Sequence, residues 1–395
     1  MSVEIIRLAA RGEGATADGR FLPLTAPGDL VSADGAITLG PHHVTPSCRH
    51  FPTCGGCQLQ HVDDAAYADF LVERVAGALG AQGIATTEIR APHISPPRSR
   101  RRASLRVERR GGSVQIGFNQ EGSHRIVDMR ECHILRPELF ALVQPLRALM
   151  LKLMSPRGNG GVRLSLADRG PDVLLEGVSA EGLEATEALT GFASAHGLSR
   201  LSIDDGYGPM TVWEPEPVTI TLGGVAVPLP HDAFLQAAED GEAALVAAMR
   251  EAVGGATIVA DLFAGLGTFA LALPGRVYAA EGARDAVLAL KAAAGAGQRQ
   301  LFVEHRDLFR RPLTTAELNR FEAVVLDPPR AGARDQVEQL ATATVPRIAY
   351  VSCNPATFAR DAKTLIDGGY RLSWVQPVGQ FRWSIHVELA AAFER

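Results

Sequence analysis

The 395-residue sequence has few cysteines, no long apolar run and no large excess of charge of either sign. The cysteines number five, which is odd, and Met1–Arg7 has no apolar stretch of a secretory signal, so we expect no disulfide framework. No run reaches the roughly 18 consecutive apolar residues that a membrane-spanning helix needs. We therefore expect a cytoplasmic protein without membrane contact.

The net charge of −5 gives no general support for a nucleic-acid partner, because phosphate binding depends on Lys and Arg. The distribution of charge is more informative. One short segment, opposed only by Glu108, contains seven arginines, which we call the arginine strip: Arg98, Arg100, Arg101, Arg102, Arg106, Arg109 and Arg110. We interpret it as a phosphate-contacting surface, and a solvated charged strand is the alternative.

The length predicts two or three domains. Residues 1–42 alternate short apolar runs with Gly-rich turns, a pattern typical of a small antiparallel β-barrel. Residues 43–225 combine a cysteine-rich loop, a helix within 62–90 and mixed strands and helices, which predicts an α+β middle domain. Strands and helices alternate over 226–395, which predicts a doubly wound, Rossmann-like α/β domain. The helix within 62–90 is expected to pack either in the middle domain or on this C-terminal one.

Gly-rich or acidic positions follow four successive strands of the predicted C-terminal sheet. A turn containing Gly265 follows the first strand, Glu281 ends the second, Asp307 follows the third, and Asp327 ends the fourth. Ligands of open α/β sheets bind along this edge, where Glu281 suits ribose hydroxyls and Asp307 suits an adenine. The sequence lacks the pyrophosphate-binding loop that a nicotinamide site needs. A small adenosine-bearing cofactor is the better fit.

Cys353 follows the next strand, so we expect its thiol at the same edge. Glu388 lies in an apolar strand, where desolvation would raise the pKa of its carboxyl and make it a usable base. A thiolate that adds to carbon 6 of uracil makes carbon 5 nucleophilic towards a sulfonium methyl, and a base then removes the carbon 5 proton. The two residues thus predict covalent methylation of uridine, and a buried, inert thiol with a salt-bridged carboxylate is the alternative.

The sequence resembles the RNA 5-methyluridine methyltransferases, which act on 23S ribosomal RNA or on tRNA, over nearly the whole chain. The motifs that carry the resemblance are Phe234-Leu-Gln236, Asp261-Leu-Phe-Ala-Gly-Leu-Gly, Asp327-Pro-Pro-Arg, Ser352-Cys-Asn-Pro and His386-Val-Glu. The resemblance implies Cys353 as nucleophile and Glu388 as proton-abstracting base. It also implies that S-adenosylmethionine contacts Gln236, Phe263, Thr268, Glu281, Asp307 and Asp327. Gly265, in the turn after the first strand, is the further cofactor contact that we expect. Residues 1–42 are similar to the TRAM domain, a small RNA-binding barrel.

Three positions depart from the pattern of this family. Ala238 stands where the family often has Asn, which puts a cofactor or substrate contact in doubt. Arg382 stands where Pro is frequent, and this change is expected to affect the loop that carries Glu388. Position 268 is often Asn, so Thr268 is a weaker assignment than its neighbours.

Four of the five cysteines form a pattern typical of a metal site. Cys48, Cys54 and Cys57 lie within ten residues, and Cys132 follows after seventy-four intervening residues. Four thiolates suit either a tetrahedral zinc ion or an iron–sulfur cluster, and the spacing alone does not decide between them. The pattern is similar to the 4Fe-4S site in a subset of the family, which implies a 4Fe-4S cluster with a structural role.

The iron–sulfur subset favours 23S ribosomal RNA over tRNA as the partner. Two other functions stay open, namely an RNA N-methyltransferase that uses Asp327-Pro-Pro-Arg alone and a non-catalytic RNA-binding protein. A cytosine-5 enzyme is disfavoured because no Cys stands beside Pro328. Nothing in the sequence predicts an obligate protein partner.

Overall fold

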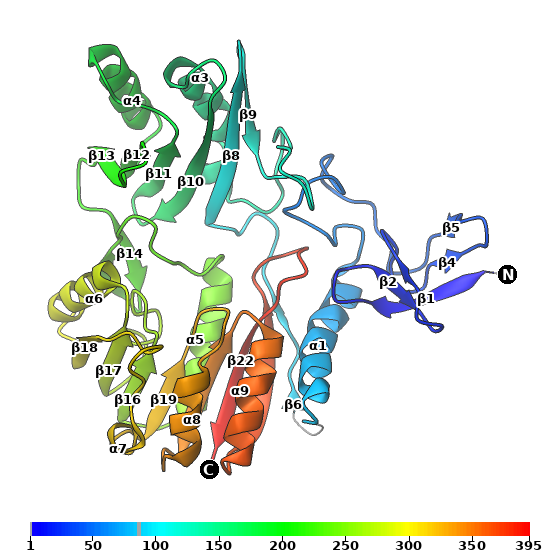
Figure 1. Ribbon diagram of the computed structural model, residues 1–395, viewed down its shortest axis with the longest axis vertical. Coiled ribbons are helices and arrows are strands. Elements are labelled where there is room, and N and C mark those ends of the chain that lie inside the picture. The colour runs from blue at the N-terminus through cyan, green and yellow to red at the C-terminus, as the bar shows by residue number, and fades with distance from the viewer. Residues whose placement is uncertain (1, 85–87) are drawn as a thin grey trace.

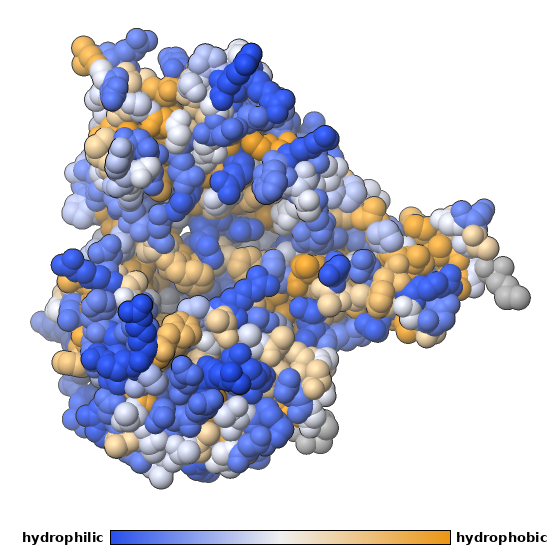
Figure 2. Space-filling view, viewed as in Figure 1, coloured by the Kyte–Doolittle hydropathy of each residue, from blue (hydrophilic) through white to orange (hydrophobic). Residues whose placement is uncertain are grey.

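The computed structural model describes residues 2–84 and 88–395, which contain three sheets and a hairpin (Figure 1). The N-terminal sheet is antiparallel, with the strand order β3-β2-β1-β4-β5, and projects to one side of the molecule. It curls as an open half-barrel, as expected for residues 1–42. Its strands are β1 (Val3–Leu8), β2 (Gly14–Thr16), β3 (Phe21–Leu22), β4 (Leu30–Val31) and β5 (Ile37–Thr38). Several apolar side chains of this sheet are exposed, namely Ile6, Phe21, Leu30 and Ile37. Figure 2 shows hydrophobic residues gathered on this projecting part of the surface.

The middle domain is built on a six-stranded sheet with the order β13-β12-β11-β10-β8-β9, in which only β11 and β12 are paired in parallel among the described strands. Its strands are β8 (Arg102–Arg110), β9 (Ser113–Gly117), β10 (Asn159–Ala167), β11 (Gly170–Glu176), β12 (Arg200–Asp204) and β13 (Pro209–Trp213). The helices α2 (Pro137–Phe140), α3 (Val143–Leu153) and α4 (Leu183–Ala195) share its apolar core.

The C-terminal domain contains the predicted doubly wound sheet. Five parallel strands stand in the order β18-β17-β16-β19-β20, and β22 pairs antiparallel with both β20 and β21. The strands are β16 (Ile258–Leu262), β17 (Arg276–Glu281), β18 (Leu301–His305), β19 (Ala323–Leu326), β20 (Arg347–Ser352), β21 (Arg371–Gly379) and β22 (Glu388–Glu394). The helices are α5 (Glu239–Val253), α6 (Arg284–Ala296), α7 (Thr315–Leu318), α8 (Arg334–Thr342) and α9 (Pro355–Asp367). Both faces of this sheet are buried, which explains the continuous apolar runs of its strands.

Segments that precede the middle domain in sequence complete the C-terminal sheet. The short strands β6 (Glu88–Ile89) and β7 (His93–Ile94) pair in parallel with β21. Helix α1 (Asp64–Ala81) packs against α9 and β21, and the Asp63 carboxylate caps it by accepting a 2.8 Å hydrogen bond from the Ala66 N–H. The hairpin of β14 (Thr219–Leu222) and β15 (Val225–Pro228) contacts α6. The boundaries between domains stay a prediction.

None of the helices within residues 2–84 and 88–395 has both the length and the apolar character that a membrane crossing requires.

Candidate active site

A cleft of about 1130 Å³ opens where the parallel strands of the C-terminal sheet end, facing the middle domain. Figure 2 shows the molecule hollowed between these two domains. The opposite wall of the cleft is formed by side chains of the middle domain and by Gly55 and Gly56 of the cysteine-rich loop. All nine residues predicted for the cofactor and the chemistry line this one cleft: Gln236, Phe263, Gly265, Thr268, Glu281, Asp307, Asp327, Cys353 and Glu388.

The turn after β16 is shaped by backbone conformations that the glycines allow. Gly267 has φ 92°, and a Cβ atom there would lie 2.4 Å from the Leu290 side chain, so only glycine fits without a shift of that side chain. The Glu281 carboxylate accepts hydrogen bonds from the N–H groups of Gly265 at 2.9 Å and Ala283 at 2.6 Å. These hydrogen bonds fix the Glu281 carboxylate beside the turn. Its oxygens keep free lone pairs that can accept a hydrogen bond from a ligand hydroxyl.

An aromatic pair lies where an adenine was predicted. The rings of Phe263 and Phe309 are 5.4 Å apart between centroids, and both line the cleft. Asp307 is exposed beside them and accepts a 3.0 Å hydrogen bond from the Phe309 N–H. The arrangement offers a flat base an apolar face and one carboxylate.

Two carboxyl groups beside the turn are protonated more readily than usual. Asp261 is fully buried, and burial raises the pKa of its carboxyl to about 7. Its Oδ2 accepts a 2.8 Å hydrogen bond from the Ala270 N–H. Desolvation, with the nearby charges of Glu388 and Asp261, raises the pKa of Asp327 well above its usual range. Asp261 supports the turn from inside, whereas Asp327 faces the cleft.

Cys353 lies close enough to Glu388 for the charge of that carboxylate to affect the ionisation of the thiol. Desolvation raises the pKa of the half-buried Cys353 thiol, the charges of Glu388 and Asp327 raise it further, and Arg330 lowers it. Glu388 is 3% exposed, and burial raises the pKa of its carboxyl to about 7, as the sequence predicted, against lowering effects of a Gln380 hydrogen bond and the Arg102 charge. A carboxyl with this pKa is a suitable proton acceptor at neutral pH.

Residues 380–387 join β21 to β22, and Arg382, one of the departures from the family pattern, lies among them. The Arg382 guanidinium donates a 3.1 Å hydrogen bond to the Ser95 carbonyl, forms an ion pair with Asp64, and lies 4.7 Å from the centroid of the Trp383 ring. The Trp383 carbonyl accepts hydrogen bonds from the N–H groups of Gln58 at 2.8 Å and Leu59 at 2.9 Å. Arg382 therefore fixes the loop through contacts of its side chain. A proline at this position would instead fix the loop by restricting the backbone dihedral angle φ.

Ala238, the other departure, is the N-cap residue of α5 and makes no side-chain cap. It is fully buried, and its N–H points at the Gln380 Oε1 atom at 3.3 Å. The asparagine that the family often has here is thus replaced by a residue whose only polar contribution is its backbone.

The arginine strip does not form one surface. Arg101 is 2% exposed, forms a 2.6 Å ion pair with Glu242 and donates a 3.0 Å hydrogen bond to the Gln236 carbonyl. The prediction of a phosphate contact is wrong for Arg101, because its charge is already satisfied inside the protein. Arg100 and Arg102 line the cleft instead. Desolvation lowers the pKa of Arg102 to about 10, and its buried Nε atom has no partner within residues 2–84 and 88–395.

Gln380 was not predicted from the sequence as a site residue, but its buried amide donates to the Gln236 side chain and accepts from the N–H groups of Ala237 and Ala238. A glutamine directly after an apolar strand carries no pattern by itself. Its place beside the His386-Val-Glu motif, one loop away, was the available signal.

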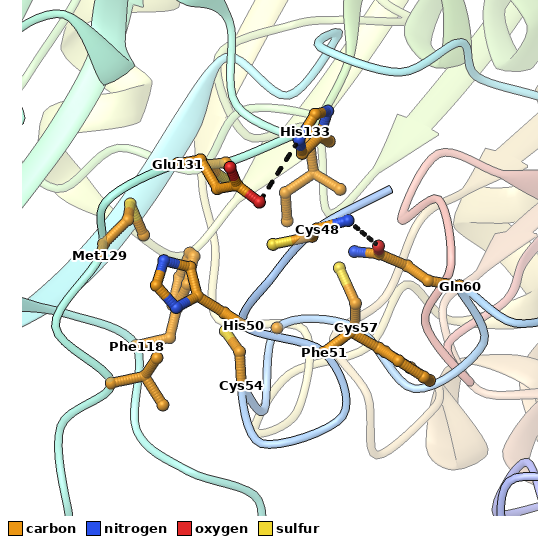
Figure 3. A pocket seen from close by; sticks show the side chains of 14 residues that line it. Cys48, His50, Phe51, Cys54, Cys57, Gln60, Phe118, Met129, Glu131 and His133 are labelled. Carbon is orange, nitrogen blue, oxygen red and sulfur yellow. Dashed lines mark hydrogen bonds and ion pairs between the residues drawn. The ribbon is translucent and has the colours of Figure 1, made fainter. Parts of the chain in front are cut away.

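The four clustered cysteines line one pocket beside the cleft, as Figure 3 shows for Cys48, Cys54 and Cys57. Apolar side chains share its wall: Phe51, Phe118, Val127, Met129 and Ile134. Burial raises the pKa of each thiol, that of Cys57 to about 12. In the part of the chain that the structure describes, no three Cys, His, Asp or Glu side chains are arranged as ligands of a metal ion. The 4Fe-4S cluster therefore stays a prediction.

Comparisons with known proteins identify the family. Residues 298–395 match the model of the tRNA (Uracil-5-)-methyltransferase family. The chain is 53% identical over 394 residues to an uncharacterized RNA methyltransferase of Zymomonas mobilis, with 99% of each chain covered. It is 33% identical to the 23S rRNA (uracil(1939)-C(5))-methyltransferase RlmD of Halomonas elongata, over 96% of this chain and 86% of that one. The chain belongs to the RNA (uracil-5-)-methyltransferase family.

Among solved structures, the enzyme is similar to the tRNA (uracil-54, C5)-methyltransferase of Pyrococcus abyssi in complex with S-adenosyl-L-homocysteine. The TM-score is 0.73 at 23% identity, and all of both chains is covered. This likeness confirms the fold. The family makes the protein a methyltransferase that acts on RNA and takes its methyl group from S-adenosylmethionine.

Proposed function

We propose that this methyltransferase modifies carbon 5 of a uridine through a covalent bond between Cys353 Sγ and carbon 6. The observation that carries the proposal is the meeting of Cys353 and Glu388 in one cleft with the glycine turn after β16. An N-methyltransferase needs neither the thiol nor a late base, and a non-catalytic RNA-binding protein needs no such cleft. A base that is flipped out of the RNA would reach this depth.

In this mechanism the Cys353 thiolate adds to carbon 6 of the ring, and carbon 5 becomes the nucleophile. Bound S-adenosylmethionine supplies the electrophilic methyl group. Glu388 then takes the carbon 5 proton, the carbon 5–carbon 6 double bond re-forms, and the bond to Sγ breaks. Arg330, which lowers the pKa of Cys353, favours the thiolate that starts the sequence.

For the cofactor, we assign the ribose to Glu281 and the adenine to the space between Phe263 and Asp307. The remaining contacts are assigned to Gln236, Gly265, Thr268 and Asp327. The support is that these side chains line one wall of the cleft and that Glu281 is held by the turn itself. Isothermal titration with S-adenosylhomocysteine tests the assignment, because Glu281→Gln should weaken binding. Glu322→Gln should not, since Glu322 is an exposed residue just before β19 that accepts a hydrogen bond from the Thr257 N–H, at the opposite end of the strands.

The proposal is tested with purified protein, RNA and methyl-labelled S-adenosylmethionine. The wild type should yield 5-methyluridine in digested RNA, and Cys353→Ala should yield none, a loss on the order of 10⁴-fold or more. A Cys353→Ala protein that still methylates RNA would instead support the N-methyltransferase.

We propose 23S ribosomal RNA as the substrate. The support is the Halomonas relative, which is named for 23S rRNA and matches nearly all of this chain. The Pyrococcus structure is a tRNA enzyme, but its likeness carries the fold alone. Mass mapping of 5-methyluridine in ribosomal and transfer RNA from cells with and without the gene decides between the two.

We also propose that Cys48, Cys54, Cys57 and Cys132 hold a 4Fe-4S cluster that pins the cysteine-rich loop to the middle domain. The support is the meeting of four thiols in one largely apolar pocket, a donor set that suits iron–sulfur chemistry. Bound as thiolates, they would lose the protons that burial now favours. Protein purified without oxygen should contain about four irons and four sulfides per chain, whereas one zinc ion per chain would contradict the proposal.

A further inference from the structure

Asp361 in α9 is a buried carboxylate, 1% exposed, that the proposed mechanism does not use. Its Oδ2 atom accepts hydrogen bonds from the Ala333 N–H at 2.8 Å and from the Tyr350 hydroxyl at 2.6 Å. Its Oδ1 atom accepts two hydrogen bonds from the Arg360 guanidinium, at 2.7 Å and 2.9 Å. A buried carboxylate is costly unless it is paired and hydrogen-bonded, and this one is both. Asp361 therefore joins α9, β20 and the loop that follows β19.

The start of α9 holds the same loop, which we call the β19–α8 loop (residues 327–333). The Arg330 carbonyl accepts hydrogen bonds from Asn354 Nδ2 and Thr357 Oγ1, each at 3.2 Å. Asn354 follows Cys353 directly and is the N-cap residue of α9. The backbone of Arg330 is thus tied to the residue next to the proposed nucleophile, and Arg330 and Cys353 line the same cleft.

The close approach of the β19–α8 loop to α9 depends on a glycine. The Ala331 carbonyl accepts a 3.1 Å hydrogen bond from the Arg360 guanidinium. Gly332 has φ 81°, and a Cβ atom there would lie 2.6 Å from Arg360 Nη2 and 2.7 Å from Asp361 Oδ2. A side chain at position 332 would therefore push the loop away from the helix.

We propose that Asp361 and Thr357 are positioning residues that hold the β19–α8 loop beside Cys353. The inference rests on the proposed function, in which the Cys353 thiolate attacks the uracil ring. The thiol first loses its proton to solvent. An electron pair of Sγ then forms the bond to carbon 6, and the electrons of the carbon 5–carbon 6 double bond move into the enolate. A cation held beside the thiol favours the form that starts this step.

The charged groups that face the Cys353 thiol are Glu388 of β22 and, in the β19–α8 loop, Asp327 and Arg330. Burial raises the pKa of the thiol, the charges of Glu388 and Asp327 raise it further, and Arg330 lowers it. If the loop is released from α9, Arg330 is no longer fixed near the thiol and the pKa rises. Less thiolate is then present at neutral pH, so the loss of rate should be largest at low pH and disappear above the raised pKa.

The test compares Thr357→Val with Thr364→Val in the purified protein. Thr364 is a matched control, because it is another half-buried threonine of α9, about two turns later, whose hydroxyl donates to the Arg360 carbonyl of the same helix at 3.4 Å. Alkylation of Cys353 by iodoacetamide is followed by mass spectrometry of its peptide over a range of pH. Because the thiolate is the reactive form, the midpoint of the rate reports the thiol pKa. The midpoint should move up by about half a unit in Thr357→Val and stay unchanged in Thr364→Val.

Asp361→Asn should have the larger effect, because the amide nitrogen that replaces one carboxylate oxygen cannot accept a hydrogen bond. The alkylation midpoint should move up by about one unit and kcat at pH 7 should fall about tenfold. The KM for S-adenosylmethionine should stay unchanged, since the cofactor side of the cleft is not altered. Thr357→Ser keeps the hydroxyl and should keep the wild-type midpoint. If Asp361→Asn does not fold, the two variants of Thr357 decide.

A double variant separates positioning from a general loosening of the site. Arg330→Met should raise the midpoint by itself, and adding Thr357→Val should raise it no further, because Thr357 acts through the loop that holds Arg330. The inference is overturned if folded Thr357→Val keeps the wild-type midpoint, if Thr364→Val shifts it equally, or if the shifts add in the double variant. Alkylation uses no RNA, so failure of the proposed function is distinct: Cys353→Ala would then still form 5-methyluridine.

Discussion

The catalytic edge and the cysteine pocket both gather side chains that lie far apart in the sequence, but they hold them in different ways. Cys353 follows β20 and Glu388 begins β22, and six ladder pairs join these two strands. Cys48, Cys54 and Cys57 lie in a loop, tied by contacts such as the 3.1 Å hydrogen bond from the Cys48 N–H to Gln60. The sheet thus sets the catalytic geometry, whereas the pocket depends on side-chain and turn contacts.

This difference between the catalytic edge and the cysteine pocket predicts that mutations in the two regions have opposite effects on activity and stability. At the catalytic edge, buried carboxyl groups with raised pKa values are unfavourable for stability at neutral pH and are needed for the chemistry. In the cysteine pocket, the side chains are expected to contribute to stability and to leave the chemical step alone. Mutations should therefore separate the two regions by their effects on rate and on the free energy of unfolding.

Glu388→Gln should have the largest effect on rate and should stabilise the protein. Loss of the base should lower turnover on the order of 10³-fold and trap the methylated adduct, visible as a protein–RNA band on denaturing gels. Because the folded-state pKa of about 7 lies above the unfolded value, the wild type loses stability as pH rises between the two. The glutamine has no such loss, so at pH 8 it should be more stable by about 3 kcal/mol, and at pH 4 nearly equal. Equal melting temperatures at both pH values would contradict this.

Arg101→Met and Arg102→Met compare two neighbouring arginines, of which Arg101 is buried and Arg102 lines the cleft. The first leaves Glu242 poorly solvated and without its partner, which should cost about 3 kcal/mol in urea unfolding. The second removes a charge that lines the cleft and whose Nε atom has no hydrogen-bond partner among the described residues, so it should weaken RNA binding about tenfold and change stability little. Filter binding and urea titration of both variants measure the contrast, and identical effects in both assays would contradict it.

Cys57→Ser tests the cysteine pocket. The residue is 7% exposed, and a buried hydroxyl in its place should lower the free energy of unfolding by about 2 kcal/mol. Bound iron should be lost, while kcat of the folded fraction should stay within a few-fold of the wild type. Cys353→Ser is the control, because it should keep the iron and lose turnover. A Cys57→Ser protein with full iron content would exclude this residue as a ligand.

Much of the catalytic edge followed from the sequence, because it depends on local rules. Apolar runs located β16, β17, β18, β19 and β20, and the carboxyl ends of parallel strands meet at one edge. The alternation along β8 also located the core, since Ala103, Leu105 and Val107 are buried while Ser104 and Arg106 are exposed. Arg101 has the same parity as the buried residues, so its burial was available from the sequence and was overlooked.

Other features were beyond local rules. β6 and β7 have two residues each, too few to show a period, and join the sheet only through β21. The Gln380 contacts connect residues more than a hundred positions apart and depend on the close approach of α5. The roles of the site residues stay predictions, since their meeting in a cleft shows proximity and not chemistry.

Arg382→Pro should have the smallest effect, and it tests the link between the two regions. The proline that the family often has would remove the contacts with Asp64 and Ser95, and the loop would still be held through the Trp383 carbonyl. We expect about 1 kcal/mol less stability and a kcat within a few-fold of the wild type, because proline restricts the backbone where arginine restrains it through contacts. Asp64→Ala is the control, since it removes the ion pair and leaves the loop backbone unchanged. A fall in kcat beyond about a hundredfold in Arg382→Pro alone would show that the backbone at position 382, and not the ion pair, sets the placement of Glu388.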